Sequence, residues 1–113
     1  RRPMADRFSG FPGALGCTLD RHVYVHADRI RGLAELATNN FAKALGHIMA
    51  HELGHVLLGE NSHSAGGIMS SKQGTPELRR MEMGSLQFSR VEAKRMRARI
   101  LAEQTALAAK MAR

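Results

Sequence analysis

The sequence is organised around residues 47–59, which read His47-Ile48-Met49-Ala50-His51-Glu52-Leu53-Gly54-His55-Val56-Leu57-Leu58-Gly59. On an α-helix, His51 and His55 lie one turn above each other on the same face. Both imidazoles can therefore point at one ion about 2 Å away, the usual Zn–N distance. Glu52 flanks such an ion without binding it and stands where a base takes a proton from a metal-bound water. The pattern predicts zinc binding; the competing interpretation is a helix with satisfied surface histidines.

Apolar residues on both sides of this motif predict a helix from about residue 40 to residue 58. The segment 38–40 offers N-caps, and Gly59 is a natural stop at the C-terminus. Gly46 and Gly54 each cost the helix about 1 kcal/mol relative to Ala, so we expect them to let another segment approach closely. The apolar face is expected to comprise Phe41, Leu45, Ile48, Met49, Leu53, Val56 and Leu57.

Two short runs before this helix predict an antiparallel hairpin, residues 14–19 and 22–26, with a turn at Asp20-Arg21. In the second run Val23 and Val25 face one way, and His22, Tyr24 and His26 the other. That polar stripe either faces solvent or borders a cleft. Asp28 is expected to cap a short helix over residues 29–37, and residues 1–13 read as irregular because prolines and glycines break any period.

The segments after the motif predict a loop and two helices. Residues 60–71 form a loop rich in small residues. Thr75 as cap and Pro76 at the first helical position predict a helix over residues 76–83. Ser89 and Glu92 form a capping box that opens a final helix to about residue 109. The expected fold class is α+β, with a small antiparallel strand layer packed on the His51–His55 helix and a helical C-terminal part, in a single domain spanning residues 1–113.

The amino-acid composition excludes several classes of structure and function. The single cysteine, Cys17, excludes an internal disulfide and a cysteine-rich structural zinc site, and no apolar run is long enough to predict a membrane span. The net charge is +7, and residues 72–113 hold ten Lys/Arg against four Asp/Glu. One alternative is therefore a basic module that binds nucleic acid or an acidic partner through its C-terminal helix. Without interleaved aromatics or a helix-turn-helix pattern, nucleic acid is the weaker expectation.

The run His51-Glu52-Leu53-Gly54-His55, followed by Gly59, His63 and Gly67-Ile68-Met69, resembles the active-site region of metzincin zinc peptidases. The eighteen residues from His51 to Met69 are similar to the spacing in matrix-metalloproteinase-like members. The resemblance covers about residues 14–70 and implies a zincin-like fold, Zn²⁺ as cofactor, and a buried Met69 in a tight turn below the metal. It also implies an upstream strand that binds substrate backbone, here Val23, Tyr24 and Val25.

The third ligand is where this sequence departs from the family pattern. The family's glycine and third histidine correspond here to Leu58 and Asn61, whereas the sequence has Gly59 and His63, displaced by one and two residues. We expect His63 to be the third ligand. The alternatives are Glu60, Asn61 and His47, or, in a gluzincin-like architecture, Glu77, Glu82 and Glu92.

The resulting hypothesis is a zinc metalloendopeptidase that hydrolyses a peptide or protein substrate, with Glu52 activating a zinc-bound water. A domain that retains zinc without catalysis is the other possibility. In many metzincins a tyrosine just after the methionine helps at the metal, and Ser71 stands at that position here. The resembled family is typically secreted or periplasmic, and no leader is visible. Its domains usually have more strands before the substrate edge, so this chain is either minimal or lacks an upstream portion.

Overall fold

The computed structural model describes residues 14–19, 21–38, 40–59, 61–84 and 86–112. The expectations for residues 1–13, Asp20, Asn39 and Glu60 lie outside these residues. The elements are β1 (Gly16–Leu19), β2 (His22–Val25), α2 (Ala27–Leu36), α3 (Phe41–Leu58), α4 (Thr75–Glu82) and α5 (Arg90–Met111). The α+β class is confirmed. None of the described helices combines the length and apolar character of a membrane span.

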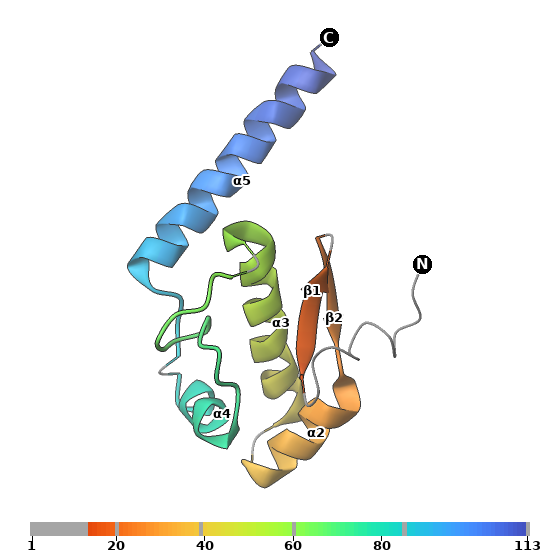
Figure 1. The fold of residues 1–113 in the computed structure, drawn as a ribbon, viewed down its shortest axis with the longest axis vertical. Helices are drawn as coiled ribbons and strands as arrows, with labels where there is room; N and C mark the ends of the chain where they lie inside the picture. Colours follow the sequence, from red (N-terminus) through yellow and green to blue (C-terminus); the bar gives the residue numbers. More distant parts are fainter. Residues whose placement is uncertain (1–13, 20, 39, 60, 85, 113) are drawn as a thin grey trace.

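Helix α3 is the central element and packs against every other helix and strand. Figure 1 shows it between the β1–β2 hairpin on one side and α4 on the other, with α5 projecting away from the rest of the chain. The expected boundaries are confirmed. Asn40 caps the helix, accepting the Lys43 N–H at 3.3 Å through its side chain. Gly59 ends it with φ +111°, a conformation that favours glycine.

The expected hairpin is confirmed as a two-stranded antiparallel sheet in which Cys17 pairs with Tyr24 and Thr18 with Val23. The hydrophobic core lies between α2, the first half of α3 and α4, where six side chains are buried: Ile30, Ala34, Ala37, Ala44, Ile48 and Leu78. This core occupies one end of α3. The other end carries the buried polar side chains His51, Glu52 and His55.

The predicted apolar face of α3 is partly wrong. Met49 is 43% exposed and Leu53 is 51% exposed, whereas His47, His51 and Glu52 are buried. The four polar residues His47, His51, Glu52 and His55 share one side of the helix with the apolar Ala44 and Ile48. The remaining sides are apolar as well, so the sequence does not determine which side is covered. The hairpin, α4 and the loop after α3 cover the side that carries the histidines.

Two predicted caps are also wrong. His26, not Asp28, caps α2: its Nδ1 accepts the Arg29 N–H at 3.3 Å. Asp28 instead lies in the first turn, where a carboxylate interacts favourably with the helix dipole. Helix α4 begins at Thr75, and its N-cap is Gly74, whose N–H donates to Glu77 Oε1 at 2.8 Å.

The capping box that opens the last helix is confirmed. Glu92 Oε1 accepts the Ser89 N–H at 2.8 Å, and Ser89 Oγ accepts the Glu92 N–H at 3.1 Å. The helix runs two residues further than expected, to Met111. The alternative function, in which this basic helix binds an acidic partner or nucleic acid, stays an untested hypothesis.

Candidate metal centre

His51 is oriented by a backbone carbonyl on its far side. It is 5% exposed on α3, and its Nδ1 lies 2.7 Å from Ile68 O in the loop that follows the helix. A carbonyl oxygen only accepts, so Nδ1 carries the proton and donates to it. Nε2 of His51 is consequently unprotonated, and its lone pair is available to the site.

His55 is oriented in the same way by the residue that ends the helix. Its Nδ1 donates to Gly59 O at 3.0 Å, and Gly59 N–H in turn donates to His55 O at 2.9 Å. Ser62 Oγ also lies 3.2 Å from His55 Nδ1. The chain turns back after Gly59, and this turn brings His63 over the helix.

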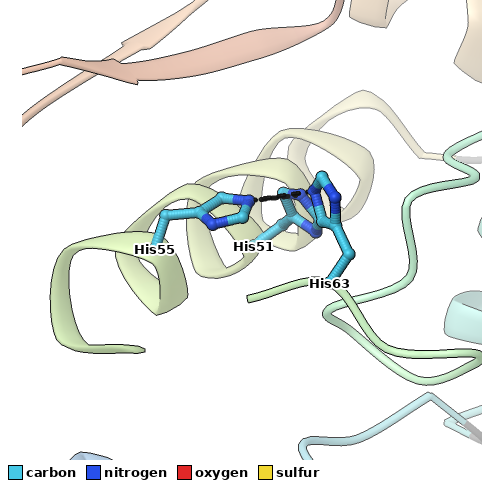
Figure 2. A group of neighbouring side chains, drawn as sticks. All are labelled: His51, His55 and His63. Carbon is cyan, nitrogen blue, oxygen red and sulfur yellow. Dashed lines mark hydrogen bonds between the residues drawn. The ribbon is translucent and has the colours of Figure 1, made fainter. Parts of the chain in front are cut away.

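The three Nε2 atoms converge, as Figure 2 shows. His55 Nε2 lies 3.2 Å from His51 Nε2 and 3.1 Å from His63 Nε2. His51 and His55 project from α3, and His63 reaches them from the loop (Figure 2). The structure therefore brings His63 together with the two helix histidines, and its role as the third ligand stays a prediction.

A positive charge between the rings would stabilise this close approach. With Nδ1 protonated on His51 and His55, both facing Nε2 atoms carry lone pairs, which repel each other at 3.2 Å. Burial lowers the pKa of His51 to about 4, so this imidazole takes up a proton less readily than an exposed one. Burial, followed by the proximity of His55, also lowers the pKa of His63.

A metal ion fits this donor set. The three residues each offer one ligand atom, all within 4.8 Å of one another, so they could hold one ion. Two nitrogens bound at about 2.0–2.1 Å to one tetrahedral Zn²⁺ lie about 3.3 Å apart, close to the 3.1 and 3.2 Å found here. Donation from Nδ1 to carbonyl oxygens is also what orients metal-binding histidines in proteins.

Glu52 lines the same cavity as the three histidines, a space of about 530 Å³. The residue is 6% exposed, and its Oε1 accepts the Thr18 hydroxyl at 2.9 Å. A Cβ on Gly16 would lie 3.2 Å from Oε2, so β1 runs directly against the carboxylate. Burial raises the pKa of Glu52, while the Thr18 hydroxyl and the nearby His55 act in the opposite direction.

Met69 lies fully buried against the helix. A Cβ on Gly54 would lie only 2.3 Å from Met69 Sδ, so this glycine does admit another segment, as expected. The same expectation is wrong at Gly46, where a Cβ would meet nothing within 4 Å. Ile68, the residue before Met69, supplies the carbonyl that orients His51. We therefore expect a displacement of Met69 to change the orientation of His51.

The cavity is lined by β1 and not by β2. Residues 14–19 all contribute to its wall, whereas Val23, Tyr24 and Val25 do not. His22 is exposed and His26 caps α2, so the polar stripe of the second strand does not border this cavity either.

Among the described residues, the other candidate ligands do not belong to the group of metal-binding atoms. Glu77 and Glu92 accept backbone N–H groups at the starts of α4 and α5, and Glu82 accepts from Lys43 Nζ at 3.0 Å. His47 is buried, but its Nε2 lies 2.5 Å from Gln73 Oε1. Asn61 lines the cavity without belonging to the group of metal-binding atoms.

Two site residues were not anticipated from the sequence, Thr18 and Gln73. A lone Thr in a short strand and a lone Gln in a polar loop form no pattern with the His51–His55 motif. The prediction of a short strand over residues 14–19 did not indicate which of its side chains would face the helix.

Comparisons with known proteins identify no relative of this chain. A scan against protein-family models finds no matching family, and searches of curated proteins and of solved structures find no match either.

Proposed function

We propose that the protein is a zinc-dependent peptidase. The observation that carries the proposal is the convergence of the His51, His55 and His63 Nε2 atoms beside the buried Glu52 carboxylate in one cavity. Three histidines and an open position are the donor set of many catalytic zinc sites, whereas structural zinc sites use four protein ligands.

Zn²⁺ held by these three imidazoles would supply Lewis-acid chemistry, polarising a substrate carbonyl and lowering the pKa of a coordinated water towards ~7. Glu52 would act as the general base and take the proton at its carboxylate. The carboxylate lies in the same cavity as the three histidines, and the Thr18 hydroxyl fixes Oε1. The same carboxyl group would then return the proton to the leaving amine.

Substrate would bind along β1 in this proposal, one strand earlier than the sequence suggested. Side chains alternate between the two faces of a strand, so a cavity against one face would be lined by every second residue. Here six consecutive residues, 14–19, border the cavity. That pattern is expected of a strand edge, and an extended peptide can pair with such an edge through backbone hydrogen bonds.

The test replaces the base without touching the ligands. Glu52→Gln should keep one zinc per chain and lose hydrolysis of unfolded casein by about 10²-fold or more. Glu35→Gln, an exposed glutamate on α2, is the matched control and should match the wild type. Zinc bound by wild type with undiminished hydrolysis in Glu52→Gln would refute the proposed mechanism.

A further inference from the structure

Gln73 links His47, a buried histidine outside the proposed metal site, to the turn whose Ile68 carbonyl orients His51. Its Nε2 donates to Ser70 O at 2.6 Å and lies 3.4 Å from Ile68 O. Its Oε1 lies 2.5 Å from His47 Nε2. One amide therefore binds two carbonyls of the loop and one imidazole of α3.

The roles of donor and acceptor follow from these partners. The amide hydrogens of Gln73 point at carbonyl oxygens, so Oε1 faces His47 and accepts from its Nε2–H. His47 is 5% exposed, and burial lowers its pKa. His47 thus acts as a neutral donor that fixes which way the Gln73 amide is turned.

Gln73 and His51 contact the same carbonyl group, that of Ile68. Ile68 O accepts His51 Nδ1–H at 2.7 Å and also faces the Gln73 amide. Gln73 Nε2 lies 3.3 Å from His51 Nδ1 as well. If His51 adopted the other tautomer, Nδ1 would accept from Gln73 and Nε2 would carry a hydrogen into the cluster. The shorter contact to Ile68 O favours the tautomer that leaves Nε2 free.

We propose that Gln73, oriented by His47, is a positioning residue that holds the Ile68 carbonyl against His51 and so keeps the His51 Nε2 lone pair directed at the metal. This role rests on the proposed function, because it matters only if His51 binds zinc. Gln73 also lines the cavity, but the role assigned to it here requires no contact with substrate.

The test removes the amide while keeping the size of the side chain. Gln73→Met should weaken Zn²⁺ binding by about 10- to 100-fold, the usual effect of losing a partner that orients a ligand. In the metal-free protein, ¹⁵N spectra of the imidazoles should show the Nδ1–H tautomer of His51 losing population. Gln104→Met, at an exposed position on α5, is the control and should change neither measurement.

A second pair of variants reads out the same role from the other end and applies if Gln73→Met does not fold. His47→Leu should weaken zinc binding, and His47→Gln, whose amide can donate in place of Nε2–H, should restore most of it. A merely structural role would lower the free energy of unfolding without changing the His51 tautomer.

The outcomes separate the two proposals. If wild type binds no zinc, the metal site is wrong and the role of Gln73 falls with it. If wild type binds zinc and neither the affinity nor the His51 tautomer changes in Gln73→Met or His47→Leu, only the positioning role is overturned.

Discussion

Replacing Gly54 or Gly46 of α3 by alanine is expected to change the free energy of unfolding in opposite directions. In Gly54→Ala the new Cβ would lie 2.3 Å from Met69 Sδ and 3.1 Å from Met69 Cε. Favourable carbon contacts are about 3.5–4.0 Å, so the methyl group overlaps a side chain that is fully buried. In Gly46→Ala the new Cβ would meet nothing within 4 Å.

The magnitude follows from comparing the pair. Both replacements gain about 1 kcal/mol of helix propensity, a contribution that cancels in the difference. Overpacking at Gly54 costs about 1–3 kcal/mol. We therefore expect Gly46→Ala to stabilise the protein by about 1 kcal/mol, and the two variants to differ by about 2 kcal/mol in free energy of unfolding.

The assay is urea unfolding of the metal-free variants, followed by zinc titration. Displacing Met69 should also move Ile68 O away from His51, so Gly54→Ala should bind zinc more weakly while Gly46→Ala binds it normally. Equal unfolding free energies for the two variants would refute the packing of Met69 against Gly54. A destabilised Gly54→Ala with unchanged zinc affinity would refute the coupling between Met69 and the site.

Three further results are expected. His63→Ala should weaken Zn²⁺ binding by at least 10-fold in a chelator competition assay, and unchanged affinity would remove His63 from the site. Thr18→Val removes the hydrogen bond that lowers the pKa of Glu52, so the acid limb of kcat/KM should move to higher pH; an unmoved limb would argue against Glu52 as the titrating base. In the metal-free protein, His51 has a pKa of about 4 against 6.5 unperturbed. The unfolded chain therefore takes up the proton first, and acid should cost on the order of 3 kcal/mol of stability between these pH values. Urea titrations of wild type and His51→Asn at several pH values measure the part of the acid destabilisation that His51 causes. An equal pH dependence of the two proteins would contradict this contribution of His51.

Local signals in the sequence located the elements that matter most. Asn40 and Gly59 bound α3, and the Val-rich run at 22–25 identified the second strand, because caps and β-branched runs act through neighbouring residues. The four-residue spacing of His51 and His55 placed their imidazoles on one face. His63 followed because it is the next histidine and a glycine turn precedes it.

The features that the sequence did not predict depend on packing between residues far apart in the chain. Helix α3 has apolar residues on every side, including the side that carries its histidines, so only its neighbours determine that Leu53 is exposed and His47 buried. The hydrogen bonds of Thr18 to Glu52 and of Gln73 to His47 join residues 34 and 26 positions apart. The cap of α4 was misplaced by one residue because Glu77 reaches back to Gly74 rather than to Thr75.

Zinc K-edge X-ray absorption of the protein loaded with one Zn²⁺ equivalent tests the central claim most directly. Three imidazole nitrogens at about 2.0 Å are expected in wild type, falling to two in His63→Ala. A spectrum with fewer than three imidazoles in the wild-type protein, or a folded protein that takes up no zinc, would contradict the account.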